Sequence, residues 1–283
     1  MSRSLRSALV VTSVAAALIL AGCASGSGGE ATEPATDDEG WVTPGKLTVA
    51  TGEPAYYPWV IDDAPESGEG FEAAVAYAVA EQLGFAADDV VWVRTGFEEA
   101  IAPGPKDFDF NLQQFSISDE RKLSVDFSSP YYETTQVVIT TGSSAAADAT
   151  SIADLKDLLI GAQTGTTSFT AIEESIQPTQ GAQAFNTNED AKLALENDQV
   201  DAIVVDLPTA FYIAGAELTD GVIVGQLPTP EGESGDQFGL LLAKDSPLTE
   251  QVSAAVDALR EDGTLDDLAE QWLGGEDEAP VLK

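Results

Sequence analysis

The stretch SISDERKLSVDFSSPYY, residues 116–132, places an arginine beside several hydroxyl groups in a chain with 49 acidic and only 12 basic residues. A guanidinium offers two parallel donors in a fork that fits a carboxylate bidentately, which an ammonium cannot do. Arg121 is therefore a candidate for holding a small carboxylate. The alternative is that SDER begins a surface helix with Ser118 as its cap. Spacing alone favours neither.

Two further segments carry polar residues where binding groups often lie. TGTTS, residues 164–168, puts glycine and hydroxyls before a predicted helix, so the backbone N–H groups of Thr166 and Thr167 could face a carboxylate at the positive helix end. No lysine follows, so a P-loop is not indicated. Asp206 ends the apolar run VDAIVVD and could also cap the helix that begins near Pro208.

Composition excludes several classes of function. The chain has no histidine, which rules out the common Ser-His and Cys-His catalytic arrangements and imidazole-ligated metals. Carboxylates, lysine and tyrosine remain as acids or bases, so we expect no enzyme, no cofactor and no metal. A net charge of −37 argues against nucleic acid as a partner, because binding it requires a basic patch.

The N-terminus indicates export. Arg3 and Arg6 precede an apolar run over residues 8–20, as in a secretory signal. LAGC resembles the lipobox of bacterial lipoproteins, which predicts a signal peptide over residues 1–22 and lipid modification of Cys23. An uncleaved anchor or a buried thiol are the alternatives. Residues 23–40 are small, polar and acidic, which predicts a flexible leash. We therefore expect a protein anchored to the cell membrane by lipid, on its extracytoplasmic face.

From residue 41 onward, β-like runs alternate with helical periods, which predicts an α/β fold. Phenylalanine alternation over residues 107–113 favours a third strand rather than a calcium loop. A helix is predicted over residues 97–101, and Asn188 is the expected cap of another. The pattern restarts after SSPYYETTQVVITTG, residues 128–142, and crossings between two lobes are expected near residues 131–136 and 234–239. This predicts one lobe from residues 41–133 plus 237–283, a second from 134–236, and a ligand cleft between them.

Seven segments, in order, resemble the extracellular solute-binding proteins of family 3. They are GKLTVATGEPAYYPW, GFEAAVAYAVAEQLG, SISDERKLSVDFSSPYY, GAQTGTTS, DAIVVDLPTA, FGLLLAKDSPL and ALREDGTLDDLAEQWLG. The resemblance implies a two-lobed periplasmic-binding-protein type II fold with a two-stranded hinge. It also implies capture of a polar amino acid outside the cell and delivery to an ABC transporter permease. We expect a monomer.

The resemblance also assigns residues. Arg121 matches the family's carboxylate-binding arginine, and Gln114 and Ser116 hold positions that help bind the same ligand end. Asp206 matches the acid that pairs with the α-ammonium. The family has small residues where this chain has Gln113 and Gln114, which leaves open whether these two glutamines line the pocket.

Other assignments concern the ligand side chain. The resemblance puts Tyr56 and Phe97 where aromatic rings sandwich the ligand, and rings also favour a cation above their faces. Glu53 and Gln163 are candidate readers of the side chain. Glu72 is expected to have a structural role at the start of the first long helix.

Two other functions stay open. Periplasmic dehydratases that act on arogenate or prephenate share this scaffold, and here such an activity would have to use Glu53, Glu72 or Asp206 as acid or base. A sensor or scaffold lipoprotein would bind a partner protein but no small ligand. The ligand is not determined, because Glu53 favours a cationic side chain and the two glutamines favour an amide.

Overall fold

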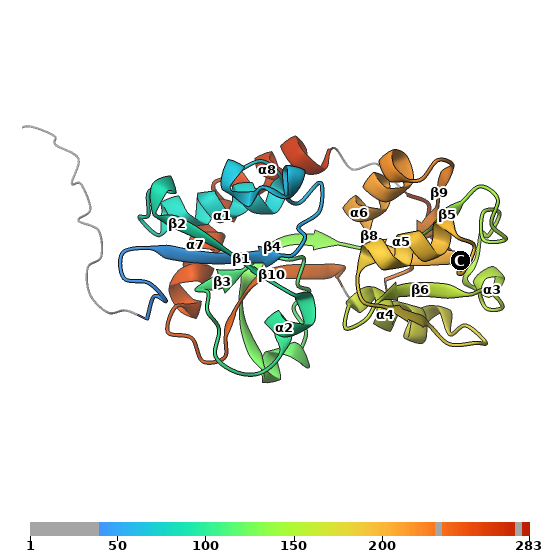
Figure 1. Cartoon of the computed structure of the whole chain (residues 1–283), viewed down its shortest axis with the longest axis horizontal. Helices are drawn as coiled ribbons and strands as arrows, with labels where there is room; N and C mark the ends of the chain where they lie inside the picture. The colour runs from blue at the N-terminus through green and yellow to red at the C-terminus, as the bar shows by residue number, and fades with distance from the viewer. Residues whose placement is uncertain (1–39, 230–233, 275–278) are drawn as a thin grey trace, which may run out of the picture. The chain divides into compact units, whose positions relative to one another are not determined.

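The computed structural model describes residues 40–229, 234–274 and 279–283 (Figure 1). Two five-stranded sheets, within one compact unit, organise them. The predicted signal peptide, Cys23 and all but the last residue of the leash lie outside the described residues. In the part that is described, no helix is long and apolar enough to cross a membrane.

The first sheet has the order β2-β1-β3-β10-β4, with β1 parallel to β2 and β3, and β10 antiparallel to β3 and β4. Its strands are β1 Leu47–Gly52, β2 Val90–Thr95, β3 Phe110–Asn111, β4 Val125–Thr134 and β10 Asp236–Ala243. Its helices are η1 Ile61–Asp63, η2 Pro65–Ser67, α1 Phe71–Gln82, η3 Ala87–Asp89, α2 Phe97–Ile101, η4 Arg121–Leu123, α7 Thr249–Glu261 and α8 Thr264–Leu273.

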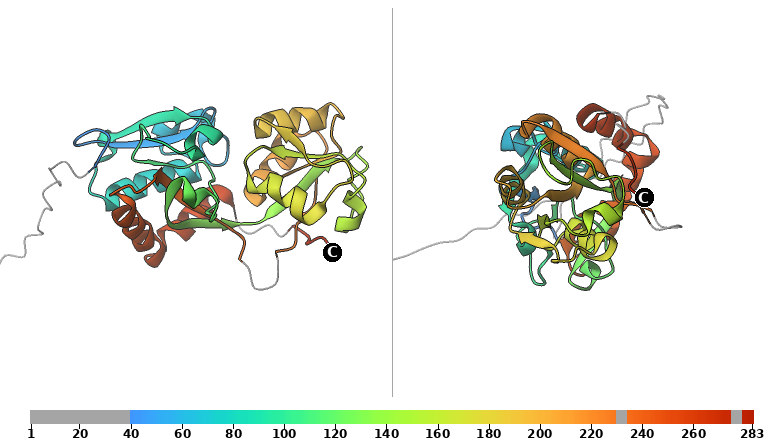
Figure 2. Two further views of the ribbon diagram at one scale, coloured as in Figure 1. Left: turned by 90° about the horizontal axis from the view of Figure 1, so that it is seen from below. Right: turned by 90° about the vertical axis from the view of Figure 1, so that its right-hand side faces the viewer.

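Helices cover both faces of this sheet. α1, α7 and α8 contact one another and bury their apolar stripes on the face formed by Leu47, Val49 and Phe110. On the opposite face, Ala100 of α2 packs with Phe115 and neighbouring residues in a smaller core. The three larger helices can be followed in Figures 1 and 2.

The second sheet has the order β7-β6-β8-β5-β9. Its strands are β5 Gln136–Thr141, β6 Ile160–Gln163, β7 Gln183–Phe185, β8 Ala202–Asp206 and β9 Gly221–Gln226, and its helices are α3 Ile152–Leu155, α4 Thr167–Ala171, η5 Ile172–Ile176, α5 Asn188–Glu196, α6 Leu207–Tyr212 and η6 Ile213–Glu217. Ile203 and Val205 face the core beneath α5 and α6, whereas Val204 faces the core beneath α3 and α4. Burial on both faces explains why β8 is apolar without alternation.

The chain passes between the sheets at short connections. β4 ends at Thr134 and β5 begins at Gln136, so a single residue separates a strand of one sheet from a strand of the other; this crossing is drawn in green in Figure 2. The return leads from β9 into β10, whose first residue, Asp236, pairs with Thr134. These two crossings are the strands of the hinge.

The C-terminal residues make a further connection, which differs from the prediction. Residues 279–283 were expected with the first lobe, yet Val281 bridges to Gln226 of β9 and Leu282 is buried in the second lobe's core. The backbone N–H of Ile152 donates to the carbonyl of Lys283 at 3.0 Å. The segment docks there because its backbone pairs with β9 and its leucine fills an apolar site.

The predictions for individual helices, strands and caps were partly correct. α2 spans the predicted residues 97–101. The third strand is only Phe110–Asn111, because β3 pairs with β1 and β10 over just these residues. The predicted cap Asn188 is wrong by one position. The N-cap is Thr187, whose Oγ1 accepts from the backbone N–H of Asp190 at 3.0 Å.

Candidate functional site

A small cavity of about 50 Å³ lies where strands of both sheets end. Gly52 ends β1, Gln163 ends β6 and Asp206 ends β8, so the cavity occupies the carboxyl ends of strands, the usual place for a ligand in open α/β sheets. Residues from both lobes line it: Thr51, Gly52, Pro54, Ala55, Tyr56, Trp59, Val60, Glu72, Phe97, Gln113 and Gln114 from the first, and Gln163, Thr166, Ser168, Asn188 and Asp206 from the second.

Arg121 reaches from the first lobe to the second. It begins η4, whose N-cap is Glu120 rather than the Ser118 of the alternative prediction, although the backbone N–H of Arg121 donates to Ser118 Oγ at 3.1 Å. Nη1 donates to the carbonyl of Ser116 at 2.6 Å and Nη2 to the carbonyl of Gly165 at 2.9 Å. Burial lowers the pKa of Arg121, and the charges of Asp236 and Asp206 oppose that shift.

A chain of hydrogen bonds continues from this arginine into the hinge. Ser116 Oγ lies 3.1 Å from Thr167 Oγ1, which in turn lies 3.3 Å from Gln136 Nε2. Gln136 Nε2 also donates to Asp206 Oδ1 at 2.9 Å and to Asp236 Oδ2 at 2.6 Å. Ser116 and Thr167 therefore join the two lobes beside the cavity.

Asp206 is the acid of the second lobe that lines the cavity. It precedes α6, but its side chain makes no capping hydrogen bond to that helix, so the alternative of a simple cap does not describe it. Burial and the charge of Asp236 raise the pKa of Asp206 to about 7, while Gln136 and Arg121 act in the opposite direction. The carboxyl group therefore lies within the electrostatic reach of Arg121.

Glu72 holds the backbone at Gln114. Glu72 is 1% exposed in the first turn of α1, and its Oε1 accepts from the backbone N–H of Gln114 at 2.8 Å and from the hydroxyl of Tyr131. Its Oε2 accepts from Gln114 Nε2. Burial raises the pKa of Glu72 to about 7 against these hydrogen bonds. The structural role expected for Glu72 is thus to fix Gln114, whose φ of 52° lies in the left-handed region.

Aromatic rings form one wall. Phe97 stacks on Phe115 with ring centroids 4.8 Å apart, and the guanidinium carbon of Arg121 lies 5.4 Å from the centre of the Phe97 ring. Tyr56 lines the cavity from the loop after β1, and Trp59 Nε1 donates to Thr209 Oγ1 of the second lobe at 3.0 Å. Burial and nearby Glu189 raise the pKa of Tyr56.

The remaining predicted residues divide by position. Gln163 lines the cavity, but its Oε1 accepts from the backbone N–H of Asn188 at 3.1 Å. Thr166 caps α4 by accepting from the N–H of Phe169 at 3.1 Å. Glu53 is exposed and lines a neighbouring pocket rather than the cavity itself. Gln113 and Gln114 both line the cavity, which answers the question that the sequence left open.

Comparison with known proteins shows which family has this fold. Residues 47–275 match the family model of bacterial extracellular solute-binding proteins, family 3. The chain belongs to this family. It is 30% identical over 210 residues to a probable histidine-binding protein of Campylobacter jejuni, covering 72% of this chain and 76% of that protein.

Solved structures agree with the fold of this family 3 protein. An ancestral arginine-binding protein bound to glutamine matches with a TM-score of 0.68 and 30% identity, over 82% of this chain and 100% of that one. The ancestral amino acid-binding protein AncCDT-1, a precursor of cyclohexadienyl dehydratase, matches with a TM-score of 0.66 and 30% identity, over 81% and 95%. The two-lobed type II architecture is therefore that of this solute-binding protein.

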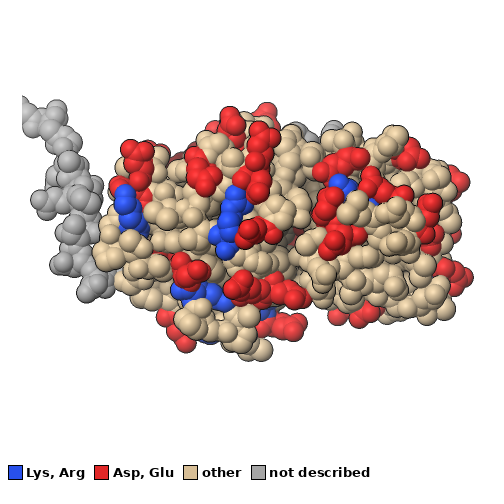
Figure 3. Space-filling view, in the orientation of Figure 1, with Lys and Arg blue, Asp and Glu red and all other residues tan. Residues whose placement is uncertain are grey.

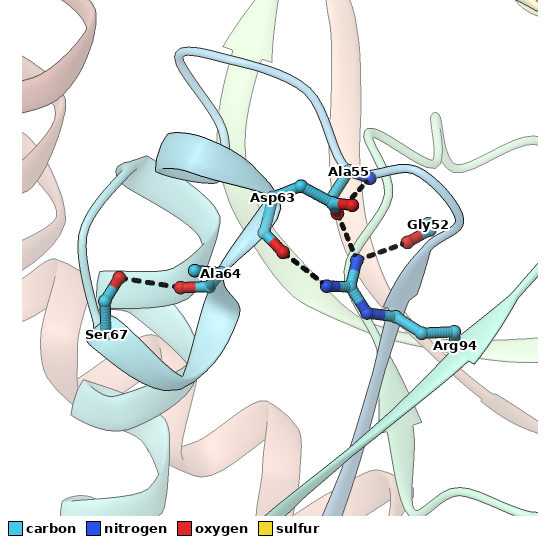
Figure 4. A network of polar contacts seen from close by, with 6 residues as sticks. All are labelled: Gly52, Ala55, Asp63, Ala64, Ser67 and Arg94. Atoms are coloured by element: carbon cyan, nitrogen blue, oxygen red, sulfur yellow. Dashed lines mark hydrogen bonds and ion pairs between the residues drawn. The ribbon is translucent and has the colours of Figure 1, made fainter.

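Sequence reasoning missed the residue that orders the Tyr56 loop of this family 3 protein. Arg94, in β2, donates through Nη1 to the carbonyl of Gly52 at 2.8 Å and to Asp63 Oδ1 at 2.6 Å, and through Nη2 to the carbonyl of Asp63 at 2.6 Å (Figure 4). Asp63 Oδ1 also accepts from the N–H of Ala55 at 2.9 Å. One guanidinium thus fastens both ends of the loop. The only signal in the sequence was an arginine at the end of a strand.

Gln136 and Asp236 were also missed. They lie within the two crossings that the sequence predicted, but a single amide and a single acid there match no motif. The acidic surface gave no help, since Asp and Glu side chains are spread over the whole face shown in Figure 3, with the basic side chains beside them. Only the hydrogen bonds through Gln136 distinguish Asp236 from these other acids.

Proposed function

We propose that the protein is the substrate-binding component of an ABC importer and captures a polar amino acid between its lobes. The observation that carries this is that Arg121 of the first lobe and Asp206 of the second lie close enough for their charges to interact, with Asp206 lining the cavity. A free amino acid has a carboxylate and an ammonium, and burying either is costly unless it meets a partner. This chain offers one partner of each sign, on opposite lobes.

The proposed contacts are those that the family resemblance assigns to residues in and beside the cavity. The ligand carboxylate is assigned to Arg121, helped by Ser116, Thr166, Thr167 and the backbone at Gln114. Nη2 of Arg121 donates to the carbonyl of Gly165, so the guanidinium that is assigned to the ligand carboxylate also joins the two lobes. Because ligand contacts are divided between the lobes, binding favours the closed arrangement, which is the form presented to the permease.

The ligand side chain is assigned to the other end of the cavity, against Tyr56 and Phe97. Gln163, Gln113 and the more distant Glu53 supply polar groups there. Gln113 Oε1 is buried and has no hydrogen-bond partner among the described residues. An unpaired buried acceptor is costly, so a ligand side chain that donates a hydrogen bond is favoured. The names of the histidine- and arginine-binding proteins that this chain resembles agree with such a ligand.

A thermal-shift screen with the twenty standard amino acids tests this function. A ligand at 100 times its Kd stabilises the native state by about 2.7 kcal/mol, which corresponds to a Tm increase of roughly 5–10 °C for a protein of this size. Calorimetry with the best ligand then compares Arg121→Ala, for which we expect binding to be lost, with Lys122→Ala as the control. No stabilisation by any amino acid, or unchanged affinity in Arg121→Ala, would contradict the proposal.

The dehydratase alternative is motivated by the likeness to AncCDT-1. A general acid needs a carboxyl group free to reach the substrate. Both oxygens of Glu72 already accept hydrogen bonds from Gln114, and Tyr131 donates to one of them, which argues against Glu72 as that acid. Incubation with arogenate or prephenate should yield no phenylalanine or phenylpyruvate.

We further propose that Cys23 carries a lipid, that residues 24–40 form a leash, and that the protein acts as a monomer on the extracytoplasmic face of the cell membrane. Support comes from the LAGC motif and the acidic, small-residue composition that follows it. In the bacterium, Cys23→Ser should move the protein from the membrane fraction to the soluble fraction. A sensor lipoprotein would share this anchor but would not respond in the amino acid screen.

A further inference from the structure

The hinge contains a second carboxyl group beside the acid assigned to the ligand ammonium. Asp236 begins β10, and Gln136 begins β5, whose register places it opposite Asp206. Gln136 Nε2 donates to Asp206 Oδ1 at 2.9 Å and to Asp236 Oδ2 at 2.6 Å. Because both oxygens bond to one nitrogen, they lie within about 6 Å of each other.

The charges around this pair do not balance. The titratable groups that face Asp206 are Asp236 from β10, Arg121 from η4, Glu72 from α1 and Tyr131 from β4. Both Arg121 nitrogens that form hydrogen bonds donate to backbone carbonyls, of Ser116 and Gly165, rather than to either aspartate. One cation thus serves three buried or half-buried acids. Two nearby carboxylates in such surroundings do not both ionise readily.

The side-chain amide of Gln136, which bridges Asp206 and Asp236, is a second and independent observation that points to a bound group at this place. Gln136 is only 9% exposed, and its Oε1 has no hydrogen-bond partner among the residues that the structure describes. The amide that joins the two acids therefore still has an unused acceptor. A donor with several hydrogens, such as an ammonium, suits a place with two carboxylates and an amide oxygen.

We propose that Asp236 is a functional residue of the site: its charge, held beside Asp206 by the Gln136 bridge, keeps Asp206 protonated in the ligand-free protein, and the ammonium of a captured amino acid replaces that proton. Only the second half of this proposal, the displacement of the proton by a ligand ammonium, rests on the proposed function. Capture then releases a proton to solvent. Affinity falls as the pH falls below the titration of Asp206, by up to about tenfold per pH unit, because the ligand must displace a proton that is bound more often.

The direction in which the pKa of Asp206 is shifted agrees with this proposal. Burial, then the charge of Asp236, raise this pKa to about 7, whereas Gln136 and Arg121 lower it. Asp236 thus acts on Asp206 by its charge and through the bridging amide. Changing Asp236 to asparagine removes the charge and keeps an oxygen for Gln136 to bond.

The first experiment needs no ligand. Carboxyl carbon signals of the aspartates are followed by NMR from pH 4 to 9 in the wild type, Asp236→Asn and Asp198→Asn, with Asp206→Asn used only to assign the Asp206 signal. Asp198 is an exposed matched control. We expect Asp206 to titrate near neutral pH in the wild type and in Asp198→Asn, and at lower pH in Asp236→Asn. Titration in the ordinary aspartate range in the wild type, or no change in Asp236→Asn, would overturn the proposal.

The second experiment counts protons with L-arginine, whose α-ammonium is fully protonated at pH 6. Calorimetry in two buffers of different ionisation enthalpy should give about 0.9 proton released by the wild type at pH 6 and close to none at pH 8. Asp236→Asn should release fewer at pH 6. A heat that is the same in both buffers at pH 6 would refute displacement of the proton. Absence of any L-arginine binding would count against the ligand class proposed above, while the titration without ligand still decides the state of the pair.

Discussion

Glu72 makes the stability of this protein depend on pH in a direction opposite to that of a salt-bridged acid. It is 1% exposed, and its pKa rises from 4.5 to about 7 because burial disfavours the carboxylate. Between these values the unfolded chain has lost the proton and the native protein still holds it. The free energy of unfolding therefore falls as pH rises through this window.

The magnitude follows from the size of the shift. Each pKa unit corresponds to 1.36 kcal/mol, so Glu72 alone costs about 3 kcal/mol between pH 4.5 and pH 8. Many other acids titrate in the same range, so the wild-type slope by itself does not isolate Glu72. The informative quantity is the difference between the wild type and Glu72→Gln, which cannot ionise.

Urea unfolding of three proteins at pH 4.5 and pH 8 measures that difference. We expect the wild type to lose about 3 kcal/mol more than Glu72→Gln between the two values. Glu81→Gln, the same substitution at an exposed position of α1, should lose as much as the wild type. Equal losses in the wild type and Glu72→Gln would show that Glu72 ionises normally in the folded protein, and would refute the effect of burial.

Two further predictions concern segments that the sequence did not indicate. Leu282→Ala removes a side chain that is 4% exposed and should lower the free energy of unfolding by about 2 kcal/mol. Val281→Ala, at a position that is 58% exposed, should change it by less than about 0.5 kcal/mol. Similar values for both variants would mean that the C-terminal segment does not pack on the second lobe. Arg94→Lys keeps the charge but cannot hold Gly52 and both acceptors of Asp63 together, so amino acid affinity should fall about tenfold by calorimetry with the unfolding free energy changed by no more than about 1 kcal/mol. Unchanged affinity would show that the loop holds its conformation without this guanidinium.

The sequence predicted the fold well where each element is marked by its own pattern. The apolar run of β8 and the short helix 97–101 are visible locally, and the crossings fall within the expected residues 131–136 and 234–239. The extent of β3 depends on its neighbours, and alternation of Phe108, Phe110 and Leu112 shows which face is buried but not how far pairing extends. The helix cap was off by one residue because Thr187 and Asn188 are both good caps.

The site was predictable to the degree that its residues belong to motifs. Arg121 and Asp206 were assigned through family segments; in the structure they belong to separate lobes and their charges interact, but of the two only Asp206 lines the cavity. Gln136 and Asp236 are 100 residues apart and meet only because two strands cross side by side. A single sequence without relatives aligned to it does not indicate such pairs. Arg94 was missed for the same reason, since its partners lie in a loop 31 and 42 residues earlier.

Docking of the C-terminal residues on the second sheet has a practical use. Trp41 packs with the core of the first lobe, whereas Lys283 is hydrogen-bonded to Ile152 of the second. A donor dye placed next to Trp41 and an acceptor dye at the C-terminus would thus be attached to different lobes. Energy transfer between them would report each capture event directly, without an engineered label in the interior of either domain.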